Sequence, residues 1–109
     1  MSLNKAYILT IEKGNILTSY NSKKFHEQIT TAKGIKTWWH YIDNTYILIV
    51  ESSILAKNIT DYVMPLIPKR RFFVCELDLR NHNGWLPQEA WDWIKKQKDD
   101  TKNDSRMFY

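Results

Sequence analysis

The sequence predicts a single α+β domain, and three observations lead to this fold class. Four short runs rich in aromatic and β-branched residues have the composition of strands. Between them lie segments in which apolar residues recur every three or four positions, which is the spacing of one helix face. The 109 residues suffice for one domain that buries roughly two thirds of the surface of its unfolded chain. A second domain is not needed.

The first expected strand covers residues 7–11, and a Lys-Gly-Asn turn sequence follows it. Ser22 can cap the helix that comes next, and Gly34 can end it. The buried side of this helix is expected to consist of the residues at i, i+4 and i+7, which are Phe25, Ile29 and Ala32.

A hairpin is expected next, because Asp43 and Asn44 tolerate the left-handed backbone of a two-residue turn. With this turn Ile42 faces Thr45 and, further along, Trp39 faces Leu48. One side of the hairpin then carries Trp38, His40, Ile42, Ile47 and Ile49, and the other carries Trp39, Tyr41, Tyr46, Leu48 and Val50. Both sides are apolar, and the isoleucine-rich side is expected to face the helices.

A second helix can begin at Ser52 or Ser53, and Pro65 and Pro68 end it. Its apolar stripe is expected to consist of Leu55, Ile59, Tyr62, Val63 and Leu66. A fourth strand is expected over residues 71–79, and Pro87 suits the first turn of a third helix over residues 87–96.

The order strand, helix, hairpin, helix, strand is that of the ferredoxin-like split βαβ unit (β-α-β-β-α-β), here with an additional C-terminal helix. We expect one such domain over residues 1–97, including that helix. Residues 98–109 form a charged tail with an apolar end, and the charged part has the composition of a solvated segment.

The hairpin also predicts an assembly. Two helices cover only one face of a four-stranded sheet, so the second apolar face needs another cover. The third helix with the tail is one available cover, and a second copy of the chain is the other. We expect both to contribute, in a homodimer whose interface contains Trp39, Tyr41, Tyr46 and Leu48. The alternative is a monomer whose own helices cover everything.

The charge of the chain is mildly positive. Sixteen basic and twelve acidic residues give a formal net charge of +4, which is compatible with nucleic acid as a partner. The strongest basic cluster is Lys69, Arg70 and Arg71, the candidate nucleic-acid-binding residues, and shorter clusters begin at Lys23 and Lys95. Such residues at the ends of strands and helices also serve solubility.

The single cysteine, Cys75, has no second cysteine to pair with and lies in an apolar run. A reducing, cytoplasmic location is the simplest expectation. No stretch approaches the roughly 18 apolar residues of a membrane span, so no membrane partner is expected.

The hairpin segment TWWHYIDNTYILIV resembles the SinR-like small bacterial and phage proteins. Their pattern has Trp-Trp-His, a hydrophobic position and Asp before a Ser/Thr-rich turn and a second strand. The later segment GWLPQEAWDWIKK is similar to the family's Gly and Trp elements before a terminal helix, and the resemblance spans most of residues 5–97. This family looks related to VapD and to the small CRISPR-associated endonuclease subunit, which implies a ferredoxin-like fold and a dimer.

The resemblance also bears on catalysis. In the nuclease-like relatives an Asp at the end of the first strand binds a divalent metal across the dimer, and the corresponding residue here is Glu12, a longer carboxylate. By strand alternation Glu12, Glu76 and Asp78 could share a face and bind Mg²⁺ or Mn²⁺. Charged strand ends that face solvent are the alternative interpretation of these carboxylates.

His40 could act as a general base, although a histidine between aromatic residues on a strand is more often structural. No Gly-rich phosphate loop and no nucleophile motif is present. The leading hypothesis is therefore an interaction or nucleic-acid-associated role with no demonstrable active site and no cofactor. The alternative is a weak metal-dependent nuclease or toxin-type ribonuclease that uses Glu12 with Glu76 or Asp78.

Overall fold

The computed structural model describes residues 4–13 and 21–101 of the chain. In chain order its elements are β1 (Lys5–Ile11), α1 (Ser22–Thr30), β2 (Ile35–Ile42), β3 (Thr45–Val50), α2 (Ala56–Val63), the short 3-10 helix η2 (Met64–Leu66), β4 (Phe72–Leu77) and α3 (Gln88–Thr101). The four strands form one antiparallel sheet in the order β2-β3-β1-β4. The predicted α+β class is confirmed.

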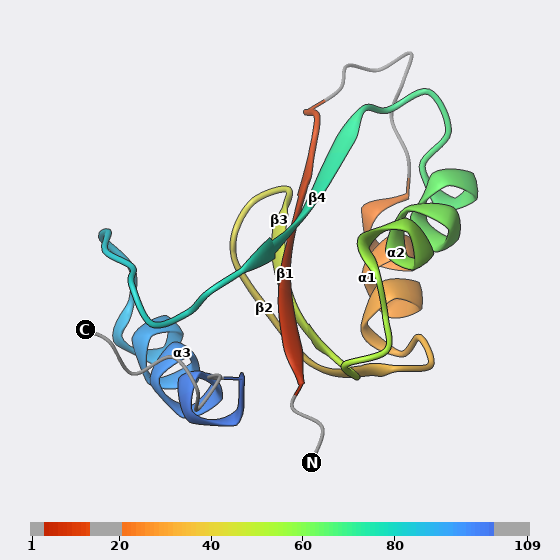
Figure 1. Ribbon diagram of the computed structural model, residues 1–109. Helices are drawn as coiled ribbons and strands as arrows, with labels where there is room; N and C mark the ends of the chain where they lie inside the picture. The colour runs from red at the N-terminus through yellow and green to blue at the C-terminus, as the bar shows by residue number, and fades with distance from the viewer. Residues whose placement is uncertain (1–3, 14–20, 102–109) are drawn as a thin grey trace.

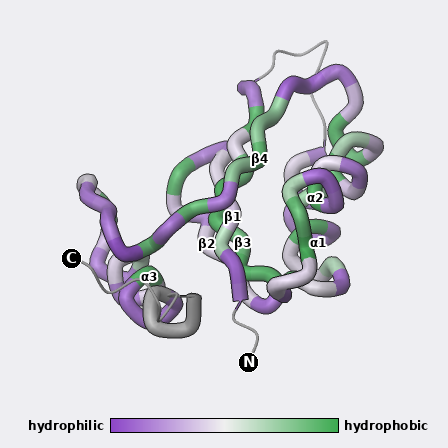
Figure 2. The backbone as a smooth tube through the Cα atoms, in the orientation of Figure 1, coloured by the Kyte–Doolittle hydropathy of each residue, from purple (hydrophilic) through white to green (hydrophobic). Residues whose placement is uncertain are grey.

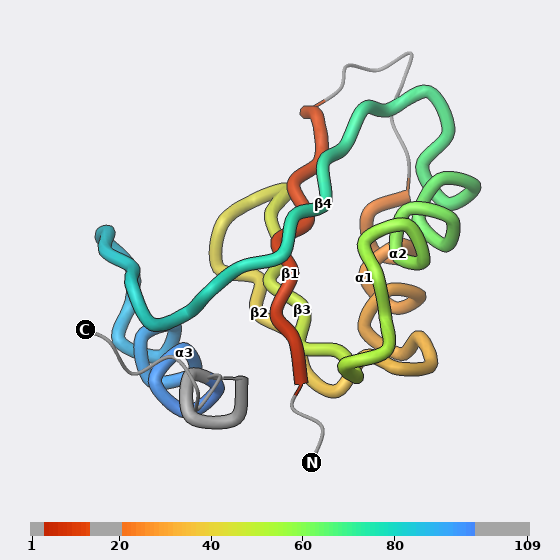
Figure 3. Tube along the Cα trace, in the orientation of Figure 1, coloured from red at the N-terminus to blue at the C-terminus, as the bar shows by residue number. Residues whose placement is uncertain are grey.

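The helices lie on both sides of this sheet. Helices α1 and α2 pack on one face, whereas α3 lies on the opposite side and is reached through a long connection from β4 (Figures 1 and 3). Hydrophobic residues follow the strands, and the connection to α3 is mostly hydrophilic (Figure 2). None of the described helices combines the length and apolar character that crossing a membrane requires.

The larger core lies between the sheet and the first two helices. The expected stripe of the second helix is wrong for Leu55 and Tyr62, which are 57% and 42% exposed. The helical side of the core consists of Phe25 and Ile29 from α1 and of Ile59 and Val63 from α2. The alternate residues of β1 and β3 supply the other side: Tyr7, Leu9, Ile11, Tyr46, Leu48 and Val50. All these side chains are at most 4% exposed, so this core contains most of the hydrophobic burial.

The helix caps differ from the prediction by a few residues. Asn21 caps α1, because its Oδ1 accepts the backbone N–H of Lys24 at 3.0 Å, and Ser22 is already the first helical residue. Helix α2 begins after Leu55, whose N–H donates to Oδ1 of Asn58 at 2.8 Å. The prediction of Ser52 or Ser53 as its cap is wrong, since Asn58 satisfies the first turn from within the helix.

A second core lies between the sheet and α3. Trp39 is 3% exposed and packs with Ile47, Ile49, Ala90 and Ile94. The start of α3 matches the prediction, because the carbonyl of Pro87 accepts the backbone N–H of Ala90 at 3.0 Å. The third helix therefore serves as a cover for the second sheet face, as expected.

The predicted hairpin register is wrong beyond the turn. Ile42 does face Thr45, and Asn44 has the expected left-handed backbone (φ 60°). A β-bulge between Trp39 and Ile42 then shifts the pairing by one residue, so Trp39 faces Ile47 instead of Leu48. Since side chains alternate along a strand, this shift exchanges the faces of the preceding part of β2.

Because the faces of β2 are exchanged, its side chains contact other residues than predicted. Trp38 and His40 lie on the side of Tyr46, facing α1, and the isoleucine-rich residues of β3 face α3. The expectation that the isoleucines face the first two helices is also wrong, because Ile47 and Ile49 pack in the core with α3. The four predicted interface residues are divided: Tyr46 and Leu48 are buried in the first core, Trp39 is buried under α3, and only Tyr41 is open, at 41% exposure. They do not form one joint surface.

The predicted start of the charged tail at residue 98 falls inside a helix. Helix α3 continues to Thr101 and so includes residues 98–101, the first part of that tail. The remaining part, 102–109, lies outside the described residues.

Candidate nucleic-acid interface

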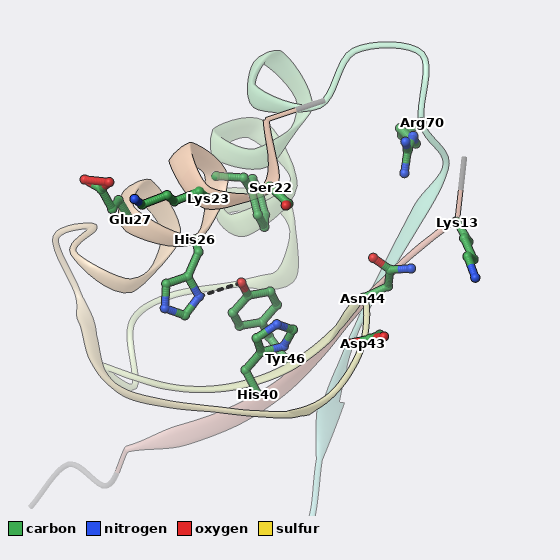
Figure 4. Close-up of a pocket in the computed structure, with 11 residues that line it drawn as sticks. Lys13, Ser22, Lys23, His26, Glu27, His40, Asp43, Asn44, Tyr46 and Arg70 are labelled. Atoms are coloured by element: carbon green, nitrogen blue, oxygen red, sulfur yellow. Dashed lines mark hydrogen bonds between the residues drawn. The ribbon is translucent and has the colours of Figure 1, made fainter. Parts of the chain in front are cut away.

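Three chain segments meet at one end of the sheet and form a groove of about 750 Å³ beside the start of α1. The backbone N–H of Ile11 donates to the carbonyl of Asn44 at 2.8 Å, which joins the end of β1 to the β2–β3 turn. Nη1 of Arg70 donates to the carbonyl of Glu12 at 2.9 Å, which joins the entry of β4 to the same place. Figure 4 shows the side chains that line this groove.

An aromatic cluster forms one wall of the groove, with His26 from α1, His40 from β2 and Tyr46 from β3 (Figure 4). The rings of His40 and Tyr46 stack in parallel, with centroids 4.1 Å apart and planes inclined by 2°. The centroid of His26 lies 5.7 Å from that of His40. This cluster depends on the β-bulge, because without the register shift His40 would lie on the opposite side of the sheet from Tyr46.

The hydrogen bonds of His26 and His40 determine which of their ring nitrogens can donate and which can accept. Nδ1 of His40 lies 2.9 Å from the carbonyl oxygen of Thr45. A carbonyl only accepts, so Nδ1 carries a hydrogen, and Nε2 of the neutral ring is left as an acceptor. Nδ1 of His26 lies 2.8 Å from the hydroxyl oxygen of Tyr46, which can donate to a neutral ring or accept from a charged one.

The charged groups of the groove come from different elements. Lys13 follows β1, Lys23 is in the first turn of α1, and Arg70 precedes β4, whereas the acidic lining groups are Glu27 and Asp43. The first residues of α1 line the groove, so the positive end of the helix dipole lies there as well. The groove therefore carries an excess of positive charge even with neutral histidines.

The predicted basic cluster divides at this site. Of Lys69, Arg70 and Arg71, only Arg70 lines the groove. Lys69 occupies a left-handed turn (φ 68°) and is exposed. The guanidinium of Arg71 forms a salt bridge with Glu12, through Nε at 3.0 Å and through Nη2, while its backbone N–H donates to the same carboxylate at 3.1 Å. The structure thus brings Arg70 together with Lys23, from a second predicted cluster.

Glu12 is engaged in this salt bridge. The side-chain and backbone hydrogen bonds from Arg71 lower the pKa of the Glu12 carboxyl below its ordinary value. A lowered pKa in the folded state means that the pair stabilises the fold above the ordinary carboxyl range, and that this contribution is lost as the pH falls through the lowered pKa. The salt bridge is exposed to solvent, so the contribution is small.

The salt bridge between Glu12 and Arg71 leads to a testable prediction. In Arg71→Gln the pKa of Glu12 should rise toward its ordinary value, because the ionised carboxylate loses its charged donor. NMR titration of the side-chain carboxyl carbons measures this, with Lys57→Gln, which removes an exposed ion pair on α2, as the control. An unchanged titration of Glu12 would contradict the assigned contact.

The three predicted carboxylates do not converge. Glu12 lies beside Arg71, whereas Glu76 faces Tyr7, five residues further along β4, or about 16 Å away at the rise of a strand. Glu76 is paired with Tyr7, a residue of the core under α1 and α2, and so lies on that side of the sheet. Burial and the nearby Glu76 raise the pKa of Tyr7. Asp78 lies further still and forms an ion pair with Arg80. Glu76 and Asp78 are therefore separated from Glu12 along β4 rather than gathered with it at one place.

No group of three or more His, Cys, Asp or Glu side chains within residues 4–13 and 21–97 could hold a metal ion.

Sequence reasoning missed His26, Tyr46 and Lys13 as members of the site. The available signal was that His26 directly follows the buried Phe25 on α1, at the edge of the apolar stripe. The third histidine, His82, lies in the connection to α3, donates from Nδ1 to the carbonyl of Leu79 at 2.8 Å and stacks on Trp91. It is not among the residues that line the groove.

The comparisons with known proteins add no relationship: no family model, curated protein or solved structure matches this chain.

Proposed function

We propose that this protein binds a nucleic-acid strand in the groove between α1 and the β2–β3 turn. One observation carries the proposal: Lys13, Lys23 and Arg70, which come from three distant parts of the sequence, line the same groove. Cations gathered along a groove suit a chain of phosphates, whose binding releases condensed counterions. The formal net charge of +4 acts in the same direction at longer range.

A single strand fits the site better than a duplex. Trp38 lies edge-on to His26, with ring centroids 4.7 Å apart, and is 38% exposed beside the groove. An exposed aromatic ring next to a basic groove offers a stacking surface to an unpaired base, which a duplex does not present. The groove, at about 750 Å³, has room for a few nucleotides rather than for a helical duplex.

Fluorescence anisotropy with labelled single-stranded RNA and DNA tests this proposal. The variant Lys23→Gln/Arg70→Gln should bind about tenfold or more weakly, because it removes two phosphate contacts. The matched control Lys95→Gln/Lys96→Gln removes two exposed charges from α3 and should bind within about twofold of wild type, as α3 lies across the sheet. Equal losses in the two variants, or no binding by the wild type, would contradict the proposal.

We further propose that two copies of the chain pair through the part of the sheet that α3 leaves open. Phe73 is 61% exposed, Cys75 is exposed, and the partners of these residues on β1 are Thr10 and Ile8. Tyr41 contacts Trp39 at the margin of the α3 core and is itself 41% exposed. β4 is also an edge strand of the sheet, and an edge strand can pair its backbone with another chain. A second copy would cover both the apolar residues and this edge.

The assembly proposal has its own test. Analytical ultracentrifugation of the wild type should give a particle of twice the chain mass, and Phe73→Lys should shift it to the monomer. Leu55→Lys, on the exposed side near α2, is the matched control and should leave the dimer intact. A monomeric wild type at tens of micromolar would refute the pairing.

The proposal includes a ferredoxin-like fold class, which the observed element order and sheet order support. It also includes membership of the SinR-like group, for which the hairpin and the late Gly-Trp segment are the support. A cytosolic location belongs to it as well, since an exposed free thiol at Cys75 suits a reducing compartment.

A further inference from the structure

We propose that His26 and His40 form a site for a phosphate monoester, the dianionic group found at the end of a nucleic-acid strand. The strand-end part of this inference rests on the proposed nucleic-acid binding, whereas the phosphate site itself can be tested without it. The ligand class follows from the hydrogen bonds, the spacing and the surrounding charges of the two rings.

The two rings have one uncommitted nitrogen each. Nδ1 of His40 is bonded to the carbonyl of Thr45, and Nδ1 of His26 is bonded to the hydroxyl of Tyr46. Nε2 of neither ring has a partner among the described residues, although both side chains are half-buried. A half-buried imidazole with an open nitrogen in a groove is suited to a ligand that supplies hydrogen-bond partners.

The spacing favours an anion of high charge. When both imidazoles are protonated, two positive charges lie with ring centroids 5.7 Å apart and repel each other. A dianion bound at both rings compensates both charges, whereas the single charge of an internal phosphodiester compensates one. The Tyr46 hydroxyl can accept from a protonated His26, and the Thr45 carbonyl accepts from His40 in either protonation state.

The charged side chains around the two rings also favour a dianionic ligand. Lys23 and Glu27 face the groove from α1, Lys13 from the end of β1, Asp43 from the turn and Arg70 from the entry of β4 (Figure 4). The three cations and two anions among these five side chains give a net charge of +1. Two protonated histidines raise the net charge of the site to +3. A phosphate monoester reduces that excess to one. Binding is therefore expected to draw protons onto the histidines.

Histidine NMR provides the test, because the chain has only three histidines. The Hε1 and ring nitrogen signals of His26, His40 and His82 would be followed at pH 7 and constant ionic strength while inorganic phosphate is added. The signals of His26 and His40 should shift toward the protonated form. Those of His82, whose Nδ1 also donates to a carbonyl but which lies outside the groove, should not move.

Variants and oligonucleotides complete the experiment. His26→Gln and His40→Gln should each lose phosphate binding at least about tenfold, and His82→Gln should retain it, with circular dichroism to show that each variant is folded. An oligonucleotide phosphorylated at one end should bind about tenfold tighter than the same sequence with hydroxyl ends. Both 5′- and 3′-phosphorylated forms would be used.

The outcomes separate the two proposals. If the phosphorylated and hydroxyl oligonucleotides bind equally well, the strand-end inference is wrong while nucleic-acid binding stands. If phosphate shifts His26 and His40 but neither oligonucleotide binds, the phosphate site stands and the proposed function is wrong. If phosphate shifts the NMR signals of all three histidines alike, the phosphate site is overturned. The same holds if Zn²⁺, added as a second probe, shifts the signals of His26 and His40 and phosphate does not.

Discussion

Replacing Trp39 with alanine is expected to lower the free energy of unfolding by about 3–5 kcal/mol, the usual range for a buried tryptophan. Trp39 is 3% exposed and lies at the centre of the core that joins the sheet to α3. Its loss leaves a cavity that Ala90 and Ile94 cannot fill from a fixed helix backbone. The buried Nε1 of Trp39 has no hydrogen-bond partner among the described residues, which offsets part of this contribution.

Urea unfolding followed by circular dichroism measures the change. Trp85→Ala is the matched control, because Trp85 is 99% exposed and its truncation should change the unfolding free energy by no more than about 0.5 kcal/mol. If Trp39→Ala lowered the unfolding free energy as little as Trp85→Ala does, α3 would not pack on the sheet in solution.

A second large loss, about 2–5 kcal/mol, is expected for Leu48→Ala. The Leu48 side chain is fully buried in the core between β3 and helices α1 and α2. Leu55→Ala is the matched control, since Leu55 is 57% exposed and should cost no more than about 0.5 kcal/mol. A small effect at Leu48 would contradict its assignment to the face covered by the first two helices.

The helices and strands were predictable from local pattern, and the hairpin faces were not. The spacing of Phe25 and Ile29, and of Ile59 and Val63, decides which side of each helix is buried, whatever the rest of the chain does. The bulge after Trp39 has no comparable local signal. It depends on how β3 pairs with β1, because that pairing and the packing of Tyr46 fix the face that β2 must match.

The candidate site could be predicted only in part. His40 and Arg70 were visible as a potential base and a cationic residue, and Lys23 as part of a second basic cluster. Their meeting in one groove depends on contacts between residues distant in sequence, such as Arg70 with the carbonyl of Glu12. The salt bridge of Glu12 could not be predicted either, because Arg71 faces Glu12 only after β4 pairs with β1.

The salt dependence of binding tests the central claim, that phosphates of a nucleic-acid strand lie in this groove. For single-stranded RNA, the logarithm of the association constant should fall linearly with the logarithm of the salt concentration. In Lys23→Gln/Arg70→Gln the slope should become less negative by about 1.4, or about 0.7 for each phosphate contact removed. A slope unchanged from wild type, with the control Lys95→Gln/Lys96→Gln behaving the same way, would contradict the account.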